Sequence, residues 1–308
     1  MILDTRQLEY IIQISEEHSI TKAAEKLFIT QSALNQQLLK LEKELGTPLF
    51  HRSRTNWRLT EAGEIYIEGA KAALQIKNTT YNRIYDVVSA RKGHLTIGLT
   101  PGRGLRMFTS IYPELHRSFP NLDVRPIEMR VRAQQDAIAK GDIDVGLMTL
   151  TQKDQTSDTY YPLKQEELVL IIPSGHPLAA KAAPSGEPLT TLDLTELRYE
   201  PFVLMDKTST LRSSCDLLFE KAGFAPNILF ETNNTSGIAA MVQSTLCCGI
   251  IPRYYTLGLT EGVACFSLPE RPSWEIVISC QKNGYLNSGA REFIRLAREY
   301  WENSAPLF

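Results

Sequence analysis

Polar side chains able to contact nucleic acid recur at helical spacing near the N-terminus. Apolar residues repeat every three or four positions through residues 31–45, which predicts a helix with one buried side. Its opposite side carries Gln31, Ser32, Asn35, Gln36, Lys40 and Lys43. Amides can hydrogen-bond base edges in the major groove, and lysines neutralise phosphates. This pattern predicts a surface that reads DNA, with an ordinary amphipathic hairpin as the alternative from periodicity alone.

A shorter helix ahead of it would complete a helix-turn-helix. Its Ala23, Ala24 and Leu27 permit close approach to the following helix. Thr21 and Thr30 stand where a hydroxyl can cap the first and the second helix of the pair. We therefore expect the second helix to begin after Thr30 and to meet the DNA backbone with its N-terminus.

A basic hairpin is expected after the reading helix. Gly46 supplies a stop signal, and residues 47–60 alternate enough to form two short strands with a turn near residues 53–56. Three arginines of this hairpin would reach the phosphate backbone or a minor groove: Arg52, Arg54 and Arg58. The hairpin would thus be a wing beside the helix-turn-helix.

A long helix is predicted next, because Thr60 can cap it and about 30 residues without proline follow. It would extend for roughly 45 Å. Its apolar seam comprises Ile65, Tyr66, Ala70, Ala73, Leu74, Tyr81, Ile84 and Val88. A helix this exposed needs a partner, and the same helix of a second chain is the economical one. We expect a homodimer.

The rest of the chain alternates strand and helix patterns in two sets. The first set has strands at 94–100, 124–129 and 144–148 and helices at 102–118 and 132–140. The second has strands at 168–173, 201–205, 227–231 and 249–252 and helices at 210–222 and 235–244. This alternation predicts two α/β lobes with parallel pairing. A strand at 274–280 and a helix at 288–301 should return to the first lobe, with crossings near 163–165 and 265–268.

Ligands bind such sheets beyond the carboxyl ends of the strands, where helix N-termini face a crevice. The candidate effector-binding residues stand at these ends: Thr100, Pro101, Gly102, Arg103, Gly104, Thr149, Thr208, Ser209, Thr210, Asn234 and Thr235. Hydroxyls, amides and Arg103 suit a carboxylate or another small anion. Plain helix capping is the alternative for each hydroxyl. Three charged residues after the second strand could line the cleft or be solvated, and solvation is favoured for them: Glu128, Arg130 and Arg132.

Composition limits the class of protein. A hydrophobic content of 43% and a charged content of 22% are ordinary for a soluble globular protein of two or three domains. No apolar run reaches the roughly 18 residues of a membrane span, and no secretion signal opens the chain. We therefore expect a cytoplasmic protein with no membrane partner. The five cysteines show neither metal-ligand nor disulfide spacing.

Three other functions compete with DNA reading. A nucleotide-dependent enzyme is disfavoured because Met107 stands where a dinucleotide loop needs its third glycine, and no catalytic constellation or cofactor motif is present. We expect no enzyme, no catalytic residue, no cofactor and no metal site. A solute-binding module would explain only the second half of the chain. A redox sensor could use Cys215, where a nearby helix start would favour a thiolate.

The N-terminal segment resembles the DNA-binding domain of the LysR-type transcriptional regulators. The residues that carry the likeness are AAEKLFITQSALNQQLLKLEKELGTPLF and RLTEAGE, within a match that extends from about Arg6 into the long helix. The resemblance implies an all-α winged helix-turn-helix (residues 1–60), a dimerising linker helix (61–92) and an α/β effector domain (93–308). The last would have a two-lobed type II periplasmic-binding-protein-like fold, with lobes 93–164 plus 268–308 and 165–267.

The resemblance also implies partners and roles. These are double-stranded promoter DNA, a small-molecule effector between the lobes, a homotetramer built as a dimer of dimers, and RNA polymerase as a further contact. The predicted base readers are Gln31, Ser32, Asn35 and Gln36, and the predicted backbone contacts are Thr30, Lys40, Arg52, Arg54 and Arg58. Asn35 and Gln36 replace the common Ser-Arg pair of the family, which favours adenine over guanine as the base contacted.

Overall fold

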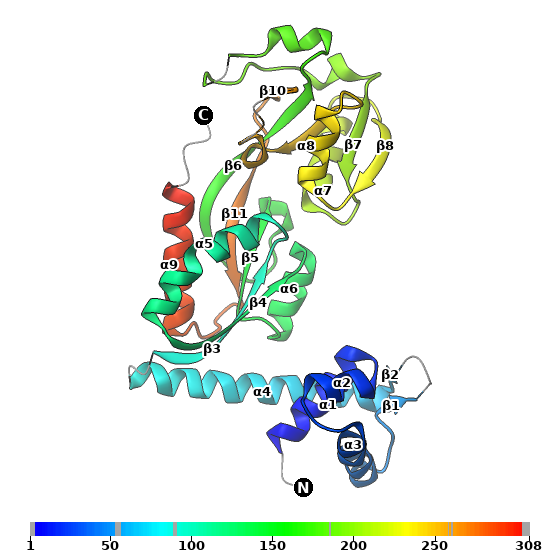
Figure 1. Cartoon of the computed structure of the whole chain (residues 1–308), viewed down its shortest axis with the longest axis vertical. Coiled ribbons are helices and arrows are strands. Elements are labelled where there is room, and N and C mark those ends of the chain that lie inside the picture. Colours follow the sequence, from blue (N-terminus) through cyan, green and yellow to red (C-terminus); the bar gives the residue numbers. More distant parts are fainter. Residues whose placement is uncertain are drawn as a thin grey trace. The chain divides into compact units, whose positions relative to one another are not determined.

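The computed structural model describes residues 4–52, 57–88, 91–184, 186–257, 259 and 261–303. The chain divides into two compact units, one formed by residues 1–94 with 140–142 and the other by residues 95–139 with 143–308. Figure 1 colours both units along the sequence from blue to red.

The first unit is a winged helix-turn-helix followed by one long helix. Its elements are α1 (Thr5–Glu17), α2 (Ile20–Lys26), α3 (Gln31–Leu45), β1 (Phe50–His51), β2 (Arg58–Leu59) and α4 (Glu61–Val87). The buried core of the unit includes Ile11, Ile14, Leu34, Leu38 and Leu41. The three leucines are the apolar side predicted for the reading helix. Strands β1 and β2 pair antiparallel, and the predicted turn at 53–56 lies outside the described residues.

Two helix caps of this unit agree with the prediction from the sequence, and one differs from it. Thr30 caps α3, and Gly46 ends it with φ of 71°. The expected cap of α2 by Thr21 is wrong, because the Ser19 hydroxyl accepts from the Lys22 N–H at 3.4 Å. The helix starts earlier because Ile20 is drawn into the core, where it is 6% exposed.

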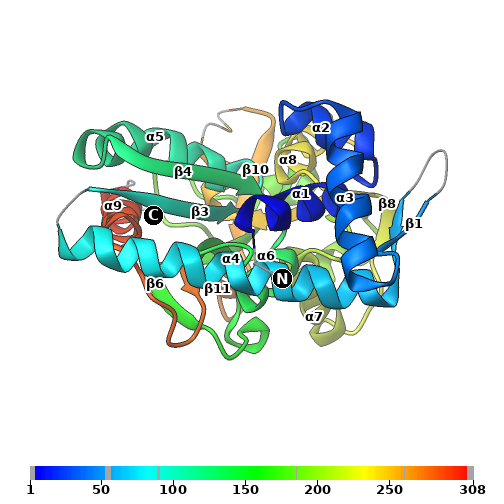
Figure 2. The same cartoon turned by 90° about the horizontal axis from the view of Figure 1, so that it is seen from below.

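Helix α4 is continuous over 27 residues, with Thr60 as the N-cap, and Figure 2 shows it as one unbroken helix. Its expected seam is exposed at several positions, including Ile65 at 67%, Ile84 at 50% and Val88 at 63%. Only part of the helix is buried in its own unit, chiefly at Ile67 and Ala70.

The second unit is an α/β fold of two lobes. Lobe I contains β3 (Lys92–Leu99), α5 (Arg103–Ser118), β4 (Asn121–Glu128), α6 (Val131–Lys140), β5 (Val145–Leu150), β11 (Ser273–Cys280) and α9 (Ser288–Asn303). Lobe II contains β7 (Pro201–Met205), α7 (Thr210–Lys221), β8 (Asn227–Thr232), α8 (Thr235–Gln243), β9 (Gly249–Pro252) and β10 (Val263–Ser267). Short 3-10 helices are η1 (Gln152–Asp154), η2 (Pro177–Lys181), η3 (Leu194–Leu197) and η4 (Arg253–Thr256).

Strand β6 (Thr159–Pro173) joins the two lobes. It pairs with β11 as far as Glu167 and with β9 and β10 beyond that residue. The large sheet therefore has the order β10-β6-β11-β5-β3-β4, with β9 also on β6. The crossing between the lobes, expected near 163–165, lies within this strand, where its partner changes after Glu167. The sequence did not indicate the first half of β6 as a strand, because that half carries half-exposed polar residues. It lies at the edge of lobe I.

Parallel pairing, predicted for both sets of strands, is confirmed in part, because the segment 168–173 of β6 pairs antiparallel with β9. Strands β3 and β5 are parallel, as are β7 and β8. Helices α5 and α9 pack on one apolar face of the lobe I sheet, and α6 packs on the other. Helices α7 and α8 bury the two faces of lobe II. The helix starts that follow β3, β7 and β8 are thereby directed to one region between the lobes.

Candidate functional site

The outer side of α3 presents the predicted DNA-reading residues. Gln31, Ser32, Gln36 and Lys40 are exposed, and Asn35 is half-buried. Thr30 accepts a hydrogen bond from the Ala33 N–H at 3.2 Å, so its hydroxyl oxygen is used for capping. Its hydroxyl hydrogen can still be donated to a phosphate. The helix therefore offers amides at its N-terminal half and a cation further along, as a helix placed in a major groove requires.

Arg52 has a structural role in addition to its predicted one. Its guanidinium pairs with Glu42, which is 8% exposed and also accepts from the Leu49 N–H at 2.8 Å. The guanidinium carbon lies 5.6 Å from the centre of the Trp57 ring. Arg52 thus fastens the wing to α3 and has only its remaining N–H groups for DNA. Arg58 on β2 is exposed, whereas Arg54 lies outside the described residues.

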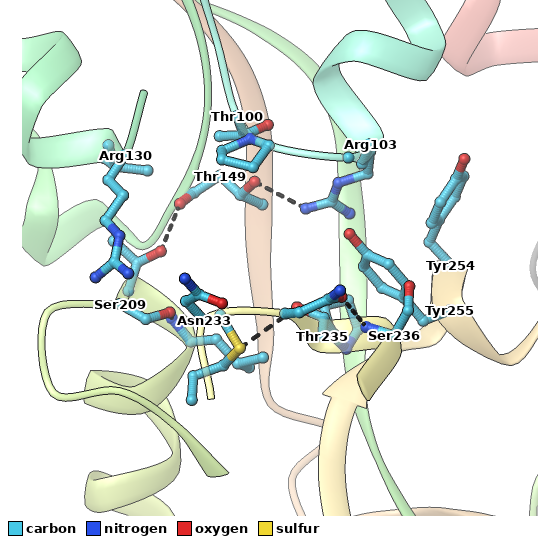
Figure 3. Close-up of a pocket in the computed structure, with 18 of the residues that line it drawn as sticks. Thr100, Arg103, Arg130, Thr149, Ser209, Asn233, Thr235, Ser236, Tyr254 and Tyr255 are labelled. Atoms are coloured by element: carbon cyan, nitrogen blue, oxygen red, sulfur yellow. Dashed lines mark hydrogen bonds between the residues drawn. The ribbon is translucent and has the colours of Figure 1, made fainter. Parts of the chain in front are cut away.

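A cavity of about 430 Å³ lies between the lobes, where β3, β5 and β7 end (Figure 3). The predicted effector residues that line it are Thr100, Pro101, Gly102, Arg103, Thr149, Thr208, Ser209, Thr210, Asn234 and Thr235. Gly104 is the exception, because it turns towards the sheet, where an added Cβ would lie 3.4 Å from the Leu147 side chain. The rule that ligands bind beyond the carboxyl ends of parallel strands therefore located one common site.

Further residues complete the lining: Arg106, Arg130, Val131, Met205, Leu211, Asn233, Ser236, Pro252, Tyr254, Tyr255 and Trp274. Tyr254, Tyr255 and Trp274 form an aromatic side of the cavity, and Figure 3 shows the two tyrosines beside Arg103. Burial raises the pKa of Tyr255, which keeps its phenol protonated as a donor. The flat rings of this side offer large contact surfaces to an apolar part of a ligand.

Arg103 is not a free cation. It is 6% exposed, pairs with Glu166 on β6 and donates to the Thr149 hydroxyl at 2.8 Å. Its guanidinium carbon lies 5.6 to 6.0 Å from the ring centres of four aromatic residues, namely Tyr254, Tyr255, Trp274 and Trp301. A carboxylate already neutralises this charge, so the anion-binding role expected for Arg103 is weakened.

The start of α5 is also partly occupied. The Gly102 N–H donates to the Glu128 carboxylate at 3.3 Å. The Gly104 N–H donates to the Thr100 carbonyl at 3.0 Å. An acid therefore already stands at this helix N-terminus, which lowers its attraction for an external anion.

Arg130 lines the cavity and is also exposed to solvent, so both of the roles considered for it apply. Its guanidinium donates to Asp206 at 2.6 Å and also to the Thr208 hydroxyl. Burial alone would raise the pKa of Asp206, but hydrogen bonds from Thr208 and Arg130 outweigh it and hold that pKa below its ordinary value. The partners lie 76 residues apart in sequence, so no local pattern could have revealed the pair. Arg106 is a second exposed cation of the lining.

The capping alternative holds for two of the lining residues. Ser209 caps α7 through the Leu211 N–H, and Asn234 caps α8 through the Ser236 N–H. The Thr210 hydroxyl donates to the Thr149 carbonyl at 3.0 Å and so links the lobes. The N-termini of α7 and α8 both point at the cavity, where the helix dipoles favour negative charge.

Cys215 lacks the exposure and the acidic thiol that a redox sensor needs. All five cysteines are free, and Cys215 is 1% exposed. Burial raises the pKa of Cys215 to about 12, so the thiolate expected near a helix start is disfavoured. Among the described residues, no helix combines the length and apolar character needed to cross a bilayer. Within the same residues, no group of three or more His, Cys, Asp or Glu is placed to hold a metal ion.

Comparison with known proteins relates both units to regulators. Residues 5–64 match the bacterial regulatory helix-turn-helix proteins of the lysR family, and residues 89–302 match the LysR substrate binding domain. The HTH-type transcriptional regulator YcgK of Bacillus subtilis is 28% identical over 309 residues, covering 96% of this chain and 94% of YcgK.

Two solved structures have a similar fold. A full-length OxyR variant from Pseudomonas aeruginosa is 21% identical with a TM-score of 0.69, covering 99% of this chain and 96% of that one. Full-length CbnR in complex with its target DNA is 20% identical with a TM-score of 0.65, covering 97% of this chain and 100% of CbnR.

Proposed function

This chain belongs to the LysR family of bacterial transcriptional regulators, and we propose that a small anion bound between its lobes controls how its helix-turn-helix engages promoter DNA. One observation carries the choice of an anion. The cavity is lined by Arg103, Arg106 and Arg130, and none of its described lining residues is Asp or Glu. A cleft with cations of this kind attracts carboxylates over cations and neutral molecules.

The anion would bind at Arg130, with Arg106 as a second cation, because Glu166 already neutralises Arg103. The starts of α7 and α8 add two helix dipoles and the hydroxyl of Ser209. The apolar remainder of the ligand would pack on Tyr255 and Met205. A compact carboxylate that bears an apolar or unsaturated group suits a cavity of this size and lining.

On the DNA side, α3 would read the major groove through Gln31, Ser32, Asn35 and Gln36. Thr30, Lys40, Arg52, Arg54 and Arg58 would hold the backbone. Asn35 and Gln36 favour adenine contacts. Two reading helices in a dimer predict an interrupted inverted repeat, with half-sites about one helical turn or a multiple apart.

The proposed domain organisation is a DNA-reading domain at 1–60, a linker helix at 61–92 and an effector domain at 93–308. The exposed seam of α4 supports dimerisation, since Ile65 is 67% exposed and Ile84 is 50% exposed. Ligand binding would alter lobe closure in a dimer of dimers and thereby shift the paired reading domains on DNA.

A thermal-shift screen of small carboxylates and their neutral amides tests the effector site. The screen compares the wild type with Ser236→Trp, which fills the cavity, and with Ala240→Trp, which adds the same ring to an exposed position of α8 outside the lining. We expect carboxylates to stabilise the wild type and Ala240→Trp, with no effect on Ser236→Trp. Equal stabilisation of all three proteins would place binding elsewhere.

A further inference from the structure

Arg130 and Asp206 connect the lobes at one wall of the cavity. Arg130 follows β4 in lobe I, and Asp206 follows β7 in lobe II. The arginine Nη1 lies 2.6 Å from the aspartate Oδ1. Asp206 is in turn fixed by Thr208, whose N–H and hydroxyl donate to the same oxygen at 3.0 and 2.5 Å. Arg130 also donates to the Thr208 hydroxyl, and the Thr210 hydroxyl donates to the Thr149 carbonyl, so these contacts together link the lobes beside the start of α7.

The two partners differ in their relation to the cavity. Arg130 lines it, and Figure 3 shows the guanidinium reaching from lobe I towards the Ser209 side of lobe II. Asp206 is not among the lining residues, and its carboxylate approaches the guanidinium from the α7 turn. The cation faces the ligand space while its counter-ion belongs to the opposite lobe.

From this placement we infer that Asp206 is a built-in competitor of the effector. In the ligand-free protein its carboxylate occupies Arg130, and an anionic ligand must take Arg130 from it. Ligand binding would then remove a lobe-to-lobe ion pair as it forms its own, which ties occupancy of the cavity to lobe closure. The inference rests on the proposed function, because it concerns the same cavity and an anionic ligand.

Comparison with the neighbouring ion pair explains why this one can exchange. Glu166 beside Arg103 has a side chain 1% exposed, and it also accepts from Trp274 Nε1 at 2.8 Å and from the Tyr254 N–H at 3.0 Å. Separating that pair would leave a charge buried without a partner. The side chains of Asp206 and Arg130 are 25% and 44% exposed, and of this pair only the Asp206 Oδ2 atom is buried without a hydrogen-bond partner. Parting this pair therefore leaves less unsolvated charge than parting the buried pair of Arg103 and Glu166.

Inorganic sulfate provides a test that does not depend on knowing the effector. Thermal unfolding of the full chain is followed over a sulfate titration at constant ionic strength set with sodium chloride. The variants are Asp206→Asn, Asp206→Ser, Arg130→Gln and the double variant Asp206→Asn with Arg130→Gln. Glu270→Gln serves as the charge-matched control, because it breaks an exposed pair with Lys221, and neither residue lines the cavity.

Removing the competitor should expose Arg130 to sulfate. Asp206→Asn and Asp206→Ser should show a saturable rise in Tm of about 3 °C, at sulfate concentrations at least about ten-fold below any such response of the wild type. Glu270→Gln should behave as the wild type, and both proteins that carry Arg130→Gln should lack the saturable component. The inference is overturned if neither Asp206 variant responds more strongly than the wild type, or if the response persists in the double variant.

These outcomes are separable from failure of the proposed function. Sulfate could stabilise the Asp206 variants through Arg130 while the carboxylate screen finds no ligand that depends on the cavity. That result would support the exchangeable ion pair and contradict the anionic effector. If carboxylates bind the wild-type cavity and the Asp206 variants bind them no more tightly, the competitor role alone is wrong.

Discussion

The guanidinium of Arg103 is paired with the carboxylate of Glu166 in the interior of the effector unit, and their side chains are only 5% and 1% exposed. Glu166 belongs to β6, the strand that passes from one lobe to the other. The pair also receives the indole N–H of Trp274 at 2.8 Å. A buried and satisfied charge pair at this crossing fixes the part of the fold about which the lobes would move.

Removing one charge of this pair should be costly. Glu166→Gln keeps the size of the side chain but leaves Arg103 charged and buried, so we expect the free energy of unfolding to fall by about 3 to 5 kcal/mol. Urea unfolding measures the loss. Glu270→Gln, on the exposed pair with Lys221, should cause no measurable change. Similar small effects from both substitutions would contradict a structural role for the buried pair.

Two glycines of α4 should respond in opposite directions to alanine. A Cβ at Gly63 would lie 2.1 Å from the Leu49 carbonyl oxygen, whereas a Cβ at Gly69 would meet nothing within 4 Å. Gly63→Ala should therefore push α4 away from the wing and destabilise the reading unit, by about 1 to 3 kcal/mol. Gly69→Ala should stabilise the helix by about 0.5 to 1 kcal/mol. Urea unfolding and DNA affinity are measured for both variants. If Gly63→Ala left the free energy of unfolding unchanged, the close contact would be refuted.

Base reading and backbone binding should separate by substitution. Gln31→Ala should cost about 1 to 3 kcal/mol of DNA-binding free energy at particular base pairs. Arg58→Ala should weaken binding to every sequence and lower the slope of log K against log salt by about one. Fluorescence anisotropy with operator variants at several salt concentrations distinguishes them. Equal losses on all sequences from both substitutions would defeat the reading role of Gln31.

Burial of Cys215 should make stability fall at alkaline pH. Its pKa is raised from 9.0 to about 12, so above pH 9 the unfolded chain releases a proton that the folded chain keeps. The unfolded state then binds fewer protons, and its thiol contributes a loss of about 1.4 kcal/mol per pH unit between those two pKa values. Urea unfolding of wild type and Cys215→Ala from about pH 8 to pH 10.5 isolates the slope. A parallel pH dependence of the two proteins would count against it.

The same thiol should be inert in the folded chain. We expect alkylation of Cys215 at neutral pH only after unfolding, because a protonated, buried thiol is not a nucleophile. Mass spectrometry of folded and urea-unfolded protein measures this. Fast labelling of folded Cys215 would revive the redox alternative.

Periodicity predicted the helix-turn-helix well because each helix buries one side. Leu34, Leu38 and Leu41 recur at helical spacing and all lie in the core. The cavity was found by a topological rule, which places strand ends such as Thr100 and Thr149 together whatever the intervening sequence. These parts depend on local patterns or on a general rule of parallel sheets.

The remainder depends on pairings between distant residues. The ion pair of Arg130 could not be predicted because its partner Asp206 comes from the other lobe. Arg103 was judged a free cation because nothing near it in sequence indicated Glu166, 63 residues away. The aromatic side of the cavity was not predicted, because none of its residues stands at the end of a parallel strand. Tyr254 is the second residue of η4, and Trp274 lies in an antiparallel strand.

If the proposed function is right, an occupied cavity changes how the chain contacts its operator DNA. DNase I footprints should therefore be recorded on the chain's operator, with saturating amounts of each carboxylate found by the thermal-shift screen. We expect the ligand to change the length of protection or the enhanced cleavage within it for the wild type and Ala240→Trp, and to leave the footprint of Ser236→Trp unchanged. An identical wild-type footprint at saturation with every such ligand would contradict the proposed function.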